Sequence, residues 1–65
     1  MKYTYYKVIQ QKWEGVWCDV DYHETNSSGL FKSREDRDAF RANLKAYRDN
    51  QSAPVRSISR RELNT

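Results

Sequence analysis

The stretch that decides the fold is WEGVWCDVDYH, residues 13–23. From residue 16 onward it alternates, with one set of Val16, Cys18, Val20 and Tyr22 and another of Trp17, Asp19, Asp21 and His23. A period of two is typical of a half-buried β-strand, and we expect the first set to point inward. Glu14-Gly15 can form a tight turn before this strand, because glycine accepts a positive φ at little cost. The stretch therefore predicts the turn and second strand of a β-hairpin.

The residues before the turn predict the other strand of the hairpin. Residues 3–13 are rich in aromatic and β-branched side chains, which favour strands. Apolar groups stand at both parities, with Tyr5 and Ile9 on one and Tyr6 and Val8 on the other. A strand that is apolar on both faces is usually central or covered on both sides. We therefore expect a hairpin over 3–23 whose first strand is internal.

A loop and a helix are expected next. The polar residues at 25–29 predict a loop over 24–32, in which Leu30-Phe31 either adds a short third strand or packs beneath the helix. Ser33 stands at the N-cap of a helix predicted over 33–49. The apolar face of this helix consists of Phe40, Leu44 and Tyr47.

The end of the chain predicts a weak last strand over 54–60 and a frayed tail over 61–65. Val55 and Ile58 are the apolar residues of that strand. Residues 1–65 are thus expected to form a single α+β domain of order β-β-α-β. Its antiparallel sheet carries one helix on one face.

The composition limits the size of the core and indicates the cellular compartment. Only 37% of the 65 residues are hydrophobic, yet they include five Tyr, two Trp and two Phe, which predicts a thin, aromatic core. Marginal stability at this size leaves a homodimer open. Cys18 is the only cysteine, and the chain has no apolar signal segment or membrane span, so we expect a cytoplasmic protein. An inward Cys18 is expected to be a small core residue rather than a nucleophile.

Positive charge follows one side of the predicted helix. At 100° per residue this basic stripe covers about 80°, beside the apolar face. It consists of Arg34, Arg37, Arg41, Lys45 and Arg48. Arg37–Arg41 and Arg41–Lys45 are i,i+4 pairs of like charge, and each pair costs about 0.2–0.5 kcal/mol of stability. Folding alone therefore does not favour the stripe. A negatively charged partner explains the stripe; alternatively, Glu35, Asp38 and Asp49 relieve the repulsion.

Two further groups are candidates for partner binding. Arg56, Arg60 and Arg61 form a second basic cluster, which together with the stripe could follow the phosphates of a nucleic acid. Trp17 lies among acids on the side of its strand that is expected to face outward, which suits a protein-binding hot spot unless the helix or last strand covers it.

Catalysis and metal binding find little support in the sequence. One histidine and one cysteine leave no Ser/His/acid set, and there is no phosphate-binding glycine motif. Asp19, Asp21, His23 and Glu24 lack any recognised metal-ligand spacing. We therefore expect a protein that is not an enzyme and that needs no cofactor.

A whole-chain pattern resembles small β-β-α-β proteins of phages and prophages. It is carried by Tyr6-Lys7-Val8, Trp13 to Trp17, Phe31 to Asp36, Ala39-Phe40, Leu44, Pro54-Val55-Arg56 and Ile58. In element order it is similar to the RNA polymerase inhibitors of T7-like phages. Those proteins are acidic and this chain has a net charge of +3, so neither target nor site residues are carried over.

Residues 6–48 also resemble the arm-type DNA-binding domains of tyrosine integrases. Those domains read DNA with the sheet, where Asp19 and Asp21 would repel phosphate in this chain. The function expected first is therefore a phage-type module that binds and modulates a host protein with an acidic surface, in the host cytoplasm. The alternative is nucleic-acid binding through the stripe and the C-terminal arginines.

Overall fold

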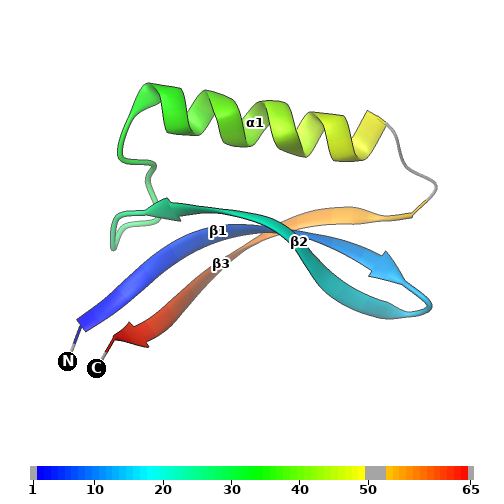
Figure 1. The fold of residues 1–65 in the computed structure, drawn as a ribbon, viewed down its shortest axis with the longest axis horizontal. Helices are drawn as coiled ribbons and strands as arrows, with labels where there is room; N and C mark the ends of the chain where they lie inside the picture. The colour runs from blue at the N-terminus through cyan, green and yellow to red at the C-terminus, as the bar shows by residue number, and fades with distance from the viewer. Residues whose placement is uncertain (1, 50–52, 65) are drawn as a thin grey trace.

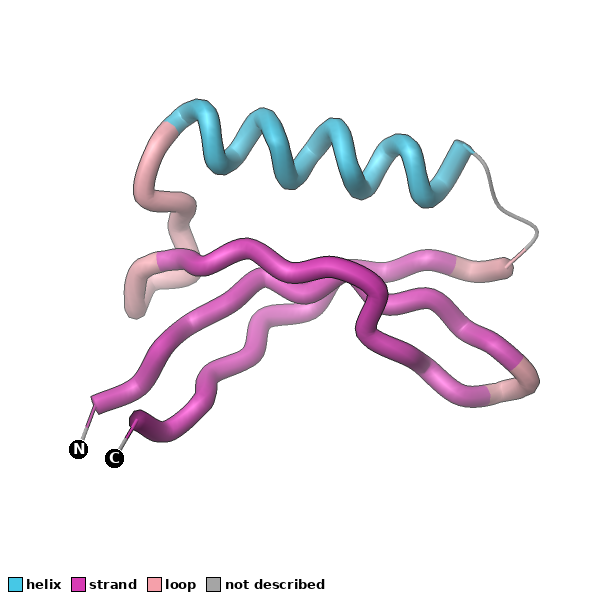
Figure 2. The backbone as a smooth tube through the Cα atoms, viewed as in Figure 1, coloured by secondary structure: helices cyan, strands magenta, loops and turns pink. Residues whose placement is uncertain are grey.

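The computed structural model describes residues 2–49 and 53–64. Its elements in chain order are β1 (Lys2–Trp13), β2 (Val16–Thr25), α1 (Arg34–Asp49) and β3 (Val55–Asn64). The strands form one antiparallel sheet in the order β2-β1-β3, and α1 lies along one face of it (Figure 1, Figure 2). The predicted α+β fold of order β-β-α-β is confirmed.

The hairpin turns at the predicted dipeptide. Glu14 and Gly15 have φ angles of 51° and 82°, so both occupy the left-handed region that a two-residue hairpin loop of type I′ requires. β1 pairs with β2 on one side and with β3 on the other. Its expected internal position is therefore confirmed, and it explains why both of its faces carry apolar side chains.

A β-bulge in β2 overturns the predicted alternation of that strand. Ile9 pairs with Asp21 and the next residue, Gln10, pairs with Asp19, which leaves Val20 as the extra residue. Side chains before and after the bulge therefore change faces. The prediction that Val16, Cys18, Val20 and Tyr22 share an inward face is wrong. Cys18 is exposed instead of belonging to the core.

The loop between β2 and α1 adds no strand to the sheet. Phe31 forms an isolated bridge with Thr25, and its ring centre lies 5.1 Å from that of Phe40. Of the two alternatives, packing beneath the helix is therefore the one observed for Phe31. Asn26 holds the loop, since its Oδ1 accepts hydrogen bonds from the backbone N–H groups of Ser28 and Leu30 at 2.9 and 3.0 Å.

α1 begins and faces the sheet as predicted. The Oγ of Ser33 accepts a hydrogen bond of 3.1 Å from the backbone N–H of Asp36, which is the geometry of an N-cap. Phe40 is buried, while Leu44 and Tyr47 are half-buried. These three residues form the face that packs on the sheet.

β3 is longer than predicted. It runs to Asn64, so the expected frayed tail is wrong for residues 61–64, and Thr65 lies outside the described residues. The reason is long-range pairing: β1 starts at Lys2 and supplies partners for this segment, such as Tyr3 for Leu63. The sequence of the tail alone contains no sign of that partner strand.

The core is thin. In residues 2–49 and 53–64, the buried apolar side chains are Val8, Ile9 and Phe40, each contributing about 1.5–3 kcal/mol. The sheet is strongly twisted, and both the hairpin turn and the paired ends of β1 and β3 bend away from α1 (Figure 1). Aromatic side chains outside the covered middle, such as Trp13 and Tyr22, are therefore exposed, and the predicted aromatic core is reduced to Phe40.

Candidate functional site

The basic stripe of α1 is open to solvent along the helix. Arg34, Arg41, Lys45 and Arg48 are exposed and Arg37 is half-buried. Two of the five form ion pairs, Arg37 with Asp38 at 3.1 Å and Lys45 with Asp49 at 3.2 Å. Such exposed pairs contribute about 0–1 kcal/mol and leave the cations accessible. The stripe therefore carries its positive charge to the surface.

One side of the stripe opens onto a groove of about 680 Å³ between α1 and the sheet. Its apolar floor is formed by Phe31, Phe40 and Leu44. Its cationic side chains come from three parts of the chain, β1, the loop before α1, and α1, namely Lys7, Lys32, Arg34, Arg37 and Arg41. No acidic side chain among the described residues lines it. We call this feature the basic groove.

Side-chain contacts hold α1 on the sheet beside the basic groove. Asn43 donates a hydrogen bond of 2.9 Å from Nδ2 to Asp21 Oδ2, and the Tyr47 hydroxyl donates one of 3.3 Å to the carbonyl oxygen of Val20. His23 meets Phe40 edge to face, with ring centres 5.9 Å apart. All three contacts join α1 to β2 and fix the position of the helix over the sheet.

Small side chains on β3 keep the groove open. Ser57 of β3 lines it, and Ser59 accepts a hydrogen bond of 3.0 Å from the ammonium group of Lys7. Lys32 at the other end pairs with Glu24 at 2.8 Å. Leu30, beside Lys32, is 64% exposed, so the groove has an apolar entrance as well as an apolar floor.

The C-terminal arginines lie away from the stripe. Arg56 and Arg60 pair with Gln10 and Tyr6 of β1, and their side chains lie on the face of the sheet that α1 does not cover. Arg61 is on the helix side, but its guanidinium stacks on the ring of Tyr3 at 4.4 Å. The structure therefore does not join Arg56 and Arg60 to the stripe in one continuous surface.

Arg56 also explains where Trp17 lies. Its guanidinium lies 4.1 Å from the centre of the Trp17 ring, and the Lys12 ammonium lies 5.8 Å from it. Trp17 is half-buried as a result. The sequence allowed Trp17 to be an exposed binding residue or to be covered by the helix or the last strand. The structure shows cover by the last strand.

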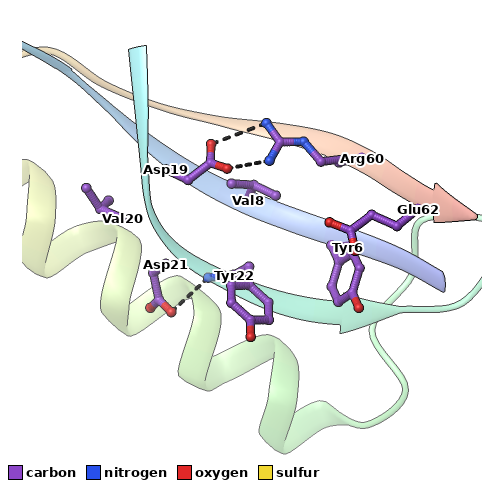
Figure 3. A pocket seen from close by; sticks show the side chains of 8 residues that line it. All are labelled: Tyr6, Val8, Asp19, Val20, Asp21, Tyr22, Arg60 and Glu62. Atoms are coloured by element: carbon purple, nitrogen blue, oxygen red, sulfur yellow. Dashed lines mark hydrogen bonds and ion pairs between the residues drawn. The ribbon is translucent and has the colours of Figure 1, made fainter. Parts of the chain in front are cut away.

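Arg60 forms a two-fold hydrogen-bonded ion pair with Asp19 across the sheet (Figure 3). This hydrogen bonding by Arg60, together with a hydrogen bond from Gln10, holds the pKa of Asp19 below its ordinary value. The bond to Asp19 raises the pKa of Arg60 in return. Both charges are therefore largely used within the molecule.

The pair closes one side of a second hollow, of about 430 Å³, on the helix-free face (Figure 3). Val8 lies at its base, and the rings of Tyr6 and Tyr22 meet edge to face with centres 5.4 Å apart. Asp19 and Glu62 are acidic groups at its rim. This hollow holds both signs of charge and has no net attraction for an anion.

The predicted site is thus partly assembled and partly dispersed. The stripe lies beside the basic groove, but sequence reasoning missed Lys7, Lys32 and Ser57 as groove residues. A weak signal existed for Lys7, which shares its parity with the buried Ile9 and so had to lie on the covered side of β1.

Other chemistry finds no assembled site in the part of the chain that the structure describes. Within residues 2–49 and 53–64, no cluster of three or more His, Cys, Asp or Glu side chains could hold a metal ion. The described helix falls short of the length and apolar character needed to cross a bilayer. Comparison with known protein families, curated proteins and solved structures found no match to this chain.

Proposed function

We propose that this protein is a small non-enzymatic module that binds an acidic surface of another protein through the basic groove and modulates that partner. The observation that carries the proposal is the groove itself, where five cations surround an apolar floor and no acidic side chain of the described residues belongs to the lining. A protein segment that presents carboxylates next to an apolar side chain satisfies both features at once.

The position of the cations favours a protein over a nucleic acid as partner. A basic surface that follows a phosphate backbone needs charge spread along a path. Here three cations of the stripe converge on the basic groove with Lys7 and Lys32, while Arg56 and Arg60 lie on the other side of the sheet and Arg60 is paired with Asp19. Nucleic-acid binding is therefore an outcome of the test, and not a second proposal.

The cellular setting comes from the sequence resemblance alone. If the chain is a phage or prophage protein, as its β-β-α-β pattern suggests, the partner is a host protein met in the host cytoplasm. A module of this size can act as an inhibitor of a host enzyme, because binding through the basic groove is enough to block or distort the surface of the partner.

The experiment compares two double charge reversals on the same helix. Arg37→Glu/Arg41→Glu reverses charge at the groove, whereas Lys45→Glu/Arg48→Glu makes the same change on the stripe outside the groove lining. Each immobilised protein is exposed to nuclease-treated bacterial lysate, and captured proteins are identified and titrated. We expect a stoichiometric partner with an acidic surface, bound at least about tenfold more weakly by the groove variant than by its control.

Two results contradict the proposal. One is equal capture of the same partner by the groove variant and by the wild-type protein. The other is capture that disappears on nuclease treatment, together with binding to purified duplex or single strands that weakens steeply with salt.

A further inference from the structure

The two edges of the sheet differ in how they are protected. On β2 the edge is interrupted by the bulge at Val20, and its end is bridged by Phe31. β3 contains no bulge, since its register with β1 runs without a shift from Asn64 to Val55. No described residue pairs with its outer edge (Figure 1).

An unbroken, uncovered edge is a template for another strand. It exposes a row of backbone N–H and C=O groups, and natural proteins usually block such edges with bulges, prolines, charged side chains or covering segments. β3 has ten residues and no proline inside it, and its charged residues are Arg56, Arg60, Arg61 and Glu62. Charge is therefore what protects this edge, and it does so only against strands whose charges do not match its own.

The sequence of β3 is complementary to itself in one antiparallel register. With a two-fold axis at Ser59, perpendicular to the sheet, residues of the same face stand opposite each other. The pairs are Val55 with Leu63, Arg56 with Glu62, Ser57 with Arg61, Ile58 with Arg60, and Ser59 with itself. Arg56 and Glu62 thus attract each other at two symmetric places, and Val55 meets Leu63, which is 47% exposed in one chain.

Neighbouring registers place like charges directly opposite. An axis at Ile58 sets Arg56 against Arg60, and an axis at Arg60 or Arg61 sets that arginine against its own copy. Like charges directly opposite across two strands are destabilising. Among these registers, the one centred on Ser59 is therefore the one in which no like charges lie directly opposite each other.

We propose that two copies of the chain associate through their β3 strands in this register and form one continuous six-stranded sheet. Both helices then lie on the same face. Arg56 can pair with Glu62 of the second copy, because only its Nε donates to Gln10 and the other N–H groups of its guanidinium are not used in that hydrogen bond. A dimer also compensates for the thin core of the single chain.

The proposal does not depend on the proposed function, although the β3 contact touches the basic groove at Ser57, which faces Arg61 of the second copy in this register. Its test uses two charge reversals, Arg56→Glu and Glu62→Arg, studied singly and as an equimolar mixture. Association is measured by sedimentation equilibrium from micromolar to millimolar concentration, with circular dichroism to confirm that each variant is folded.

We expect the wild-type protein to be a dimer and Glu62→Arg to dimerise at least about tenfold more weakly, since two attractive pairs become repulsive. Arg56→Glu is expected to be weakened in the same way. In the mixture every 56–62 contact again joins opposite charges, so the two variants should form a heterodimer. The control pair Lys45→Glu and Glu35→Arg makes the same charge changes on α1 and should leave each dimer intact.

Three outcomes would overturn the proposal. The first is a wild-type protein that stays monomeric at millimolar concentration. The second is a dimer that Glu62→Arg does not weaken, which would place the contact elsewhere. The third is an α1 control, Glu35→Arg, whose dimer is weakened as much as that of Glu62→Arg, which would make the effect one of net charge and not of register.

Discussion

Asp19 and Gln10 link the three strands on the face that α1 leaves open. Arg60 of β3 pairs with Asp19 of β2 across β1, and Gln10 of β1 donates a hydrogen bond of 2.8 Å to the same carboxylate. The carbonyl oxygen of the Gln10 side chain accepts a bond of 2.8 Å from Arg56, which stacks on Trp17. These contacts give Arg56, Arg60 and Trp17 a role in the fold that their residue types alone do not reveal.

The ion pair predicts a specific acid sensitivity. Hydrogen bonding by Arg60 lowers the pKa of Asp19 in the folded state. Its stabilising contribution is therefore complete above the unfolded value of about 3.9 and is lost as the pH falls through the lower folded value. Asp19→Asn should thus be less stable than wild type near neutral pH, and the difference should shrink in acid below about pH 3.9. Urea unfolding at both pH values measures it.

The matched control for this prediction removes the partner. In an Arg60→Gln background, Asp19→Asn should have a smaller effect near neutral pH, because the main cause of the lowered pKa is absent. A difference between Asp19→Asn and its parent that stays constant with pH, in both backgrounds, would show that the pair is not what couples stability to acid.

Among the elements, α1 depends on its first turn. The Oγ of Ser33 is the acceptor for the backbone N–H of Asp36, and an N-cap of this kind is worth about 1 kcal/mol. Ser33→Ala should lower the free energy of unfolding by about that amount, as measured by denaturant titration. Ser28→Ala in the preceding loop is the control, since in the described structure only its backbone N–H forms a bond, and a loss as large as that for Ser33→Ala would contradict the assignment.

Elements specified by local chemistry were predictable from the sequence. The turn needs two residues at positive φ, and Glu14-Gly15 marks it. Ser33 followed by a 3.6-residue apolar period marks α1 and its buried face. In each case the deciding contacts join residues close in sequence, so a short window contains the whole signal.

Elements specified by distant partners were not predictable. The extra residue Val20 is visible only once β1 and β2 are aligned, and this single residue turned Asp21 and His23 toward α1 and Tyr22 to the opposite face. Residues 61–64 are ordered by β1, not by their own composition. The stripe followed from helical periodicity, whereas the basic groove also contains Lys7, Lys32 and Ser57, which only the fold brings beside α1.

On the scale of the whole molecule, charge and stability are in tension. The chain has a net charge of +3 and, among its described residues, a core of three buried apolar side chains, yet it gathers cations around one groove. Association through β3 would add backbone pairing and would set the grooves of two copies on the same face, one on either side of the new contact. A partner with two acidic segments would then gain from binding both grooves.

The central claim is that the cations of α1 are retained for a partner and not for the fold. Arg41 tests it most directly, because it has like-charged i,i+4 neighbours in Arg37 and Lys45 and a third cation, Lys7, in the same groove. Arg41→Glu converts these repulsions into attractions, at the expense of one attraction to Asp38.

The measurement is the free energy of unfolding of Arg41→Glu against wild type, by urea titration at low salt. We predict that the variant is more stable by about 0.2–0.5 kcal/mol, and that the gain diminishes as salt is added. A variant that is less stable than wild type would contradict the account, because the stripe would then serve the fold itself.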